Sequence, residues 1–161
     1  MLTDQKLAFF NTFGYLAFPG LLADCVDRII EEFEAIWDVH GGGHDGKPHD
    51  GKQRSCIVPF LDQSEYLCTL LDEPRIHDIA ASICGDDFNY TGSDGNYYAG
   101  DTNWHSDGYG VDRILSIKIA FYLDSLTAET GALRMIPGSH RAGETYADAL
   151  ERDIRESGKI W

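Results

Sequence analysis

Residues 104–123 have the sequence WHSDGYGVDRILSIKIAFYL, and from position 115 onward apolar side chains occupy every second position. This period of two residues is typical of a β-strand with one face on a hydrophobic core, so the pattern predicts a strand over residues 113–123. Lys118 and Tyr122 would share the opposite face of that strand. The apolar face consists of Leu115, Ile117, Ile119, Phe121 and Leu123.

The segments before this strand have helical patterns, whereas the segments around it have the composition of strands and turns. Residues 26–37 carry apolar side chains at helical spacing, with Asp24 as the expected N-cap. Pro74 and Gly85 are suited to begin and end a helix over 74–84. Helices followed by strands indicate an α+β fold with an antiparallel sheet or barrel. Further helices are expected over 3–10, 63–71 and 144–157, and further strands over 13–18, 55–60, 102–107 and 132–136.

The composition describes a globular chain of 161 residues with a net charge of −14. Its length fits a single domain over 1–161. The acidity argues against nucleic acid and anionic membrane surfaces as partners, because both repel a negative chain. The sequence contains no run of about 18 apolar residues, so it predicts no membrane span, and the N-terminus does not resemble a secretory signal. The four cysteines form no C-x-x-C pair, so free thiols and a cytoplasmic location are expected.

His105 and Asp107 carry the clearest chemical pattern. Two residues apart on a strand, they would point to the same face and offer an imidazole nitrogen and a carboxylate oxygen to one cation. A second imidazole from a distant strand would complete a facial triad that leaves three positions of Fe(II) open. The alternative for an isolated H-x-D is a solvated turn. A metal site is not expected in the glycine-rich segment 38–54, despite its histidines, and a long mobile loop is predicted there instead.

Several motifs of this chain resemble those of the phytanoyl-CoA dioxygenase family of Fe(II)- and 2-oxoglutarate-dependent oxygenases. FGYL at 13–16 and PGLL at 19–22 are similar to the family's opening, and WHSD at 104–107 to its W-H-x-D, in the form found in ectoine hydroxylases. GALRMIPGSHR at 131–141 is similar to G-x-L-x-x-x-P-G-S-H-(K/R). The resemblance implies a double-stranded β-helix, a jelly roll or cupin-like fold, with N-terminal helices.

The resemblance also implies an activity. Members of the family decarboxylate 2-oxoglutarate with O₂ and hydroxylate an unactivated C–H bond of a small-molecule substrate. His105 and Asp107 would ligate Fe(II). The carboxylate favours hydroxylation, because related halogenases have Gly or Ala at the position of Asp107. Trp104 is expected to form an apolar wall near the iron.

Contacts with the cosubstrate are expected from Asn96, Thr102 and Lys118. Asn96 lies where ectoine hydroxylases have an asparagine near the cosubstrate, and Thr102 directly precedes the W-H-S-D motif. Lys118 would reach the cavity from its strand. The alternatives are a turn residue for Asn96 and a solvated side chain for Lys118. His140 belongs to the turn after P-G-S and is not the expected distal iron ligand, and structural ion pairs are expected for Arg134 and Arg141.

One part of the family pattern is missing. The distal histidine and the arginine that anchors 2-oxoglutarate normally follow P-G-S-H, but no histidine follows His140. Arg152 and Arg155 lie in the helical segment. We therefore expect the third ligand, the arginine and the last strands beyond residue 161, so that 1–161 is an incomplete domain. The alternatives are a truncated, catalytically inactive jelly-roll binding module and a metal enzyme of different chemistry, such as a cupin-type isomerase. The sequence specifies neither substrate nor oligomeric state.

Overall fold

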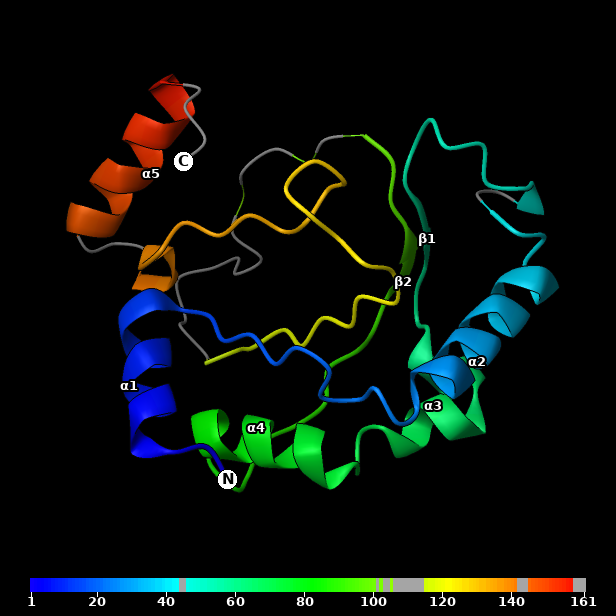
Figure 1. The fold of residues 1–161 in the computed structure, drawn as a ribbon, viewed down its shortest axis with the longest axis horizontal. Helices are drawn as coiled ribbons and strands as arrows, with labels where there is room; N and C mark the ends of the chain where they lie inside the picture. The colour runs from blue at the N-terminus through cyan, green and yellow to red at the C-terminus, as the bar shows by residue number, and fades with distance from the viewer. Residues whose placement is uncertain (44–45, 101, 103–104, 106–114, 142–144, 158–161) are drawn as a thin grey trace.

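The computed structural model describes residues 1–161 except 44–45, 101, 103–104, 106–114, 142–144 and 158–161. In Figure 1, α1 to α4 follow the rim of the molecule, while the two strands and residues 115–138, which contain no helix or strand, run inside it. The helices are α1 (Asp4–Phe13), α2 (Val26–Val39), α3 (Glu65–Thr69), α4 (Pro74–Cys84) and α5 (Thr145–Ser157), the 3₁₀ turns are η2 (Leu61–Gln63) and η3 (Ser139–Arg141), and the strands are β1 (Ser55–Ile57) and β2 (Gly95–Tyr97).

The two strands form an antiparallel ribbon with two different faces. Ser55 pairs with Tyr97 and Cys56 with Asn96. Ser55 is buried on the inner face, where the ring of Tyr97 packs against Trp37 of α2 with the ring centroids 4.7 Å apart. Because side chains alternate along a strand, Cys56 and Asn96 point to the outer face. The ribbon thus separates the core from a polar surface.

The core is built around the apolar face of α2, as the helical spacing predicts. The predicted N-cap is wrong: Cys25 occupies that position, and Asp24 binds Arg75 instead. By contrast, α4 has the predicted bounds, with Pro74 in its first turn and Gly85 at its C-cap. The buried cluster comprises Leu22, Ile29, Ile36, Trp37, Ile57, Phe60, Leu67, Leu70 and Ile76.

Several predicted strands do not form in the part of the chain that the structure describes. Residues 115–123 and 132–136 have no ladder there, and β1 is shorter than predicted. Ile119 and Leu123 still pack on the core, whereas the side chain of Leu115 is 58% exposed. Alternation determines which side chains face the core, but a ladder also requires a neighbouring strand. The predicted strand over 13–18 is wrong as well, because α1 extends to Phe13 and residues 14–18 join no ladder.

The end of α1 contacts the P-G-S-H segment. Gly14 ends the helix in the left-handed conformation with φ +83°, and its N–H donates to the carbonyl of Phe10. The N–H of Gly138 donates to the carbonyl of Phe13 at 3.0 Å. The Nε2 atom of His140 lies 3.2 Å from the carbonyl oxygen of Asn11. Two motifs from opposite ends of the sequence therefore form one junction.

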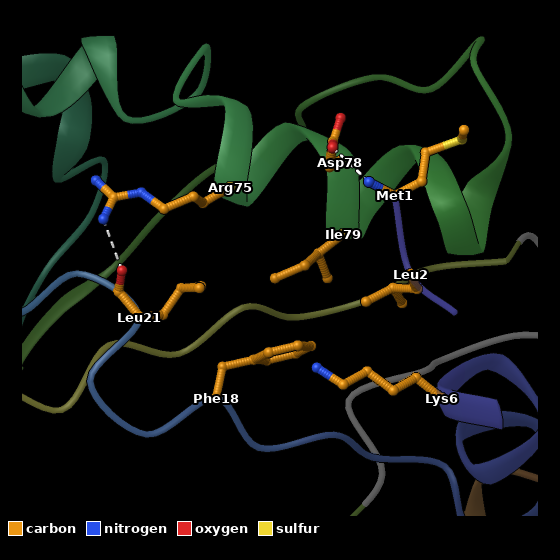
Figure 2. Close-up of a pocket in the computed structure, with 8 residues that line it drawn as sticks. All are labelled: Met1, Leu2, Lys6, Phe18, Leu21, Arg75, Asp78 and Ile79. Atoms are coloured by element: carbon orange, nitrogen blue, oxygen red, sulfur yellow. Dashed lines mark hydrogen bonds and ion pairs between the residues drawn. The ribbon is translucent and has the colours of Figure 1, made fainter. Parts of the chain in front are cut away.

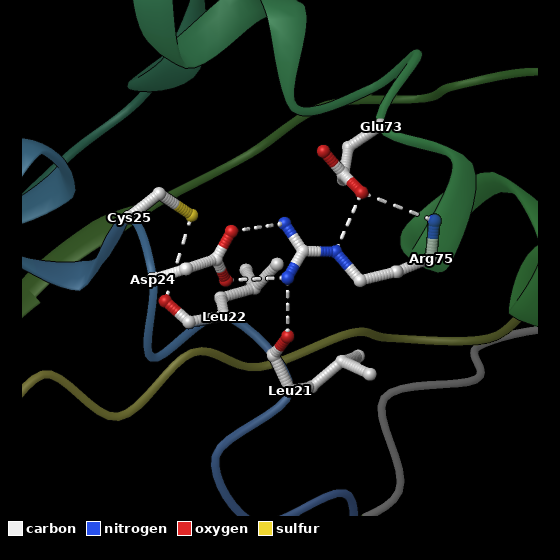
Figure 3. A network of polar contacts seen from close by, with 6 residues as sticks. All are labelled: Leu21, Leu22, Asp24, Cys25, Glu73 and Arg75. Atoms are coloured by element: carbon white, nitrogen blue, oxygen red, sulfur yellow. Dashed lines mark hydrogen bonds and ion pairs between the residues drawn. The ribbon is translucent and has the colours of Figure 1, made fainter.

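Arg75 joins the first turn of α4 to the segment before α2 (Figure 3). Its guanidinium donates to both carboxylate oxygens of Asp24, at 2.5 and 3.2 Å, and to the carbonyl of Leu21 at 2.7 Å. It also donates to Glu73 at 2.6 Å. These hydrogen bonds lower the pKa values of Asp24 and Glu73 below their ordinary range.

We predict that Gly14→Ala destabilises the fold more than Gly20→Ala does. Both glycines have positive φ, which costs alanine about 1 kcal/mol. A Cβ at Gly14 would also lie 2.4 Å from Nδ1 of His140, whereas nothing lies within 4 Å at Gly20. The expected losses in the free energy of unfolding are about 1 kcal/mol for Gly20→Ala and about 2–3 kcal/mol for Gly14→Ala. Urea denaturation measures the free energy of unfolding of both variants. Equal losses would contradict the close contact between Gly14 and His140.

We also predict that the Arg75 contacts make stability depend on acid pH. A carboxyl whose pKa is lowered by folding contributes stability above its unfolded pKa and loses it as pH falls through the folded value. The free energy of unfolding should therefore fall between about pH 5 and about pH 3, and fall less in Arg75→Gln. Arg28→Gln, which removes the ion pairs of Arg28 with Glu31 and Glu32 on α2, is the control. Parallel pH profiles for Arg75→Gln and the wild type would refute the assignment.

Candidate functional site

Three side chains on the outer face of the ribbon hold one another in a closed set of hydrogen bonds. Arg54 Nε donates to Asn96 Oδ1 at 2.6 Å, and Arg54 Nη2 donates to Asp94 Oδ2 at 3.0 Å. Asn96 Nδ2 donates to the same oxygen of Asp94 at 2.9 Å. We call Arg54, Asp94, Asn96 and the adjacent Lys118 the outer-face cluster. The closed set fixes the orientation of the Asn96 amide, with its oxygen toward Arg54.

The strand register brings this cluster together. Arg54 directly precedes β1 and Asp94 directly precedes β2. Since alternate side chains share a face, Arg54 lies on the same face as Cys56, and Asp94 on the same face as Asn96. Lys118 approaches from the extended segment 115–123, with its Nζ 3.9 Å from Asp94 Oδ1. At that distance the ion pair is loose, and Lys118 is largely exposed.

Two tyrosines border the cluster. The guanidinium carbon of Arg54 lies 5.1 Å from the centre of the Tyr98 ring, within the range of a cation–π contact. Burial raises the pKa of Tyr122, and the nearby phenol of Tyr98 raises it further. Tyr98 and Tyr122 are nevertheless 62% and 51% exposed as residues. The outer face therefore combines fixed polar groups with accessible aromatic surface.

The structure brings together two of the predicted cosubstrate contacts and leaves the iron ligands untested. Asn96 and Lys118 both lie beside Asp94. Thr102 and His105 are exposed, while Asp107 and Trp104 lie outside the described residues. Within the described part of the chain, no three histidine, cysteine or acidic side chains gather as a metal site. His105 and Asp107 as iron ligands stay a prediction.

Arg54 and Asp94 were not recognised from the sequence. Each precedes a short strand, and their contact depends on a register between segments 40 residues apart. Alternation about Cys56 and Asn96 places them on one face only when that pairing is known. An arginine next to a strand was the available signal, and by itself it indicates no partner.

The described histidines of the segment 38–54 do not converge on one point. His40 Nε2 lies 2.6 Å from Gln63 Oε1, and His49 Nδ1 lies 2.9 Å from the hydroxyl of buried Ser55. The N–H of His49 also donates to the carbonyl of Gly42. His44 lies outside the described residues. His40 and His49 therefore attach the loop to the fold at two separate places.

A family model described as phytanoyl-CoA dioxygenase (PhyH) matches residues 10–158. The chain belongs to the phytanoyl-CoA dioxygenase family. Members of this family are typically dioxygenases, and membership implies a cupin-like fold. A search of curated proteins and a search of solved structures give no significant match. The matched range includes the outer-face cluster and the W-H-S-D segment.

A pocket of about 210 Å³ in this phytanoyl-CoA dioxygenase family member lies apart from the predicted site residues, between the N-terminal segment and α4 (Figure 2). Its charged groups already have partners: Arg75 binds Asp24, and Asp78 binds the amino group of Met1. Lys6 Nζ lies 4.6 Å from the centre of the Phe18 ring. Its lining consists of Met1, Leu2, Lys6, Phe18, Leu21, Arg75, Asp78 and Ile79.

Among the helices described, none has the length and apolarity to cross a membrane.

We predict a measurable energetic coupling between Arg54 and Asp94. A double-mutant cycle with Arg54→Gln and Asp94→Asn should give about 0.5–1 kcal/mol, because the pair is partly exposed but held in a closed hydrogen-bonded set. The exposed pair Arg28 and Glu31 on α2 is the control and should give about 0.3 kcal/mol. Urea denaturation of the single and double variants measures both. A coupling no larger than that of the control would show that the cluster is not preorganised.

Proposed function

We propose that the chain is an Fe(II)- and 2-oxoglutarate-dependent oxygenase domain that hydroxylates an unactivated C–H bond of a small-molecule substrate. The observation that carries the proposal is the family match over residues 10–158, which includes W-H-S-D at 104–107. The proposal includes a jelly roll whose cavity is bordered by the outer face of the β1–β2 ribbon. The polar character of that face supports it, because the opposite face is packed on the core.

The iron would be held by His105 and Asp107, with a further histidine as the third ligand. An imidazole and a carboxylate are donors that suit a divalent ion with open coordination positions. His105 is an exposed residue. When bound, Fe(II) supplies the activation of O₂ that the oxidation of a C–H bond requires. The described residues alone do not assemble this site.

The chain's own side chains would bind and orient 2-oxoglutarate. Asn96 directs one N–H to Asp94, and its second N–H can donate to a carboxylate. Lys118 would supply a positive charge on the same face. The hydroxyl of Thr102 would donate to the bound cosubstrate.

We predict that His105→Ala and Asp107→Ala each lower the affinity for Fe(II) by at least about 10-fold, because each removes one first-sphere donor. Equilibrium dialysis under anaerobic conditions measures the iron bound. His77→Ala, at an exposed position of α4, is the matched control and should bind iron like the wild type. Thermal unfolding of His105→Ala and His77→Ala should be similar, since His105 and His77 are both exposed.

Succinate release with and without 2-oxoglutarate then tests the reaction. The Fe(II)-loaded protein should release succinate only with 2-oxoglutarate and O₂, and His105→Ala should abolish this release. Full iron binding by either ligand variant would disprove the metal assignment. A protein that binds 2-oxoglutarate but no iron would instead be the inactive binding module. An iron-loaded protein that converts a substrate without 2-oxoglutarate would be an enzyme of the isomerase type.

A further inference from the structure

Arg54 is fixed by the fold but keeps part of its hydrogen-bonding capacity. Its Nε and Nη2 atoms donate to Asn96 and Asp94, and Nη2 also lies 3.3 Å from the sulfur of Cys56. Among the residues that the structure describes, none provides an acceptor for Nη1. A guanidinium is planar, so contacts along one edge determine the direction of the other edge. Arg54 thus presents a preoriented N–H donor, and its side chain is 45% exposed.

The surface beside this donor is aromatic. The pairing of Ser55 with Tyr97 places Arg54 opposite Tyr98, which agrees with the contact between guanidinium and ring. Tyr122 lies near Tyr98 and belongs to the segment 115–123. Both residues are more than half exposed, although large aromatic residues usually lose most of their exposed surface on folding. A fixed cation beside the Tyr98 ring, with Tyr122 near that ring, is a combination that recognises an anion with a flat apolar body.

We propose that Arg54, Tyr98 and Tyr122 form a subsite for an aromatic carboxylic acid, which is the substrate class of this oxygenase. The substrate carboxylate accepts a hydrogen bond from Nη1 of Arg54, and its ring lies against the two tyrosine rings. The inference rests on the proposed function, because it assigns Asn96 and Lys118 to the cosubstrate on the same face. Asp94 holds Arg54 at Nη2 and so leaves Nη1 for the substrate.

The test measures binding to the metal-free protein, so that it is independent of iron. The probes are 3-phenylpropionate and indole-3-acetate, with the uncharged 3-phenylpropanamide and the ringless hexanoate as comparison compounds. Both aromatic acids should bind in isothermal titration calorimetry, and both comparison compounds should bind at least about 10-fold more weakly. Arg54→Gln should raise the Kd of the acids at least about 10-fold, and Tyr122→Leu about 3-fold.

Arg28→Gln is the matched control, because Arg28 also contacts a tyrosine ring and carboxylates but lies on α2. It should leave the Kd unchanged. Arg54→Lys keeps the charge and loses the planar donor, so its Kd should lie between those of the wild type and Arg54→Gln. This variant keeps the test available if Arg54→Gln folds poorly. Tyr122→Leu leaves the hydrogen bonds of Arg54 intact and gives a second, independent readout.

Absence of binding by either acid at millimolar concentration would overturn the proposal, as would an unchanged Kd in Arg54→Gln. The last measurement is competition between 2-oxoglutarate and 3-phenylpropionate. If 2-oxoglutarate displaces 3-phenylpropionate, and Arg54→Gln weakens both ligands equally, the subsite belongs to the cosubstrate and the substrate class is wrong. Simultaneous binding of 2-oxoglutarate and 3-phenylpropionate supports a separate substrate subsite. A failure here leaves the iron-binding test of His105 and Asp107 unaffected, so the two proposals fail separately.

Discussion

The contact between Trp37 and Tyr97 joins the helical part of the molecule to its small sheet. Trp37 is 1% exposed, and Tyr97 is also held by its hydroxyl, which donates to Glu34 of the same helix at 2.5 Å. Burial and this hydrogen bond raise the pKa of Tyr97, so its phenol stays neutral. Because neighbouring side chains of a strand point in opposite directions, fixing Tyr97 inward directs Asn96 and Tyr98 outward. The position of the outer-face cluster therefore depends on the burial of Tyr97 against Trp37 on the inner face.

Local determinants explain which parts of the fold were predictable. The bounds of α4 follow from Pro74 and Gly85, and the buried face of α2 follows from its helical spacing. The alternation from Leu115 to Leu123 identified two core contacts but no strand pairing, which depends on distant segments. In the site, Asn96 and Lys118 could be named individually. Their association through Arg54 and Asp94 depends on the β1–β2 register, which no local pattern encodes.

The P-G-S-H motif of the family has a structural role in this chain. Gly138 and His140 of the P-G-S-H segment contact the end of α1, beside Gly14. That motif therefore stabilises the fold, because it contacts the C-terminal end of α1 and places the His140 imidazole against the backbone of Gly14. The case for chemistry depends on W-H-S-D instead. A relative could keep the first motif, and hence the fold, while lacking the donors for a metal.

The position of the outer-face cluster in so acidic a chain affects how an anion approaches it. At low ionic strength the net charge of −14 repels a carboxylate before it reaches Arg54. At about 0.15 M salt the Debye length is about 8 Å, which screens this repulsion but weakens the contact with the cation much less. Added salt should therefore accelerate association with anions, the reverse of ordinary electrostatic steering. Selection among anions then depends on shape and hydrogen bonding at contact, and not on attraction from a distance.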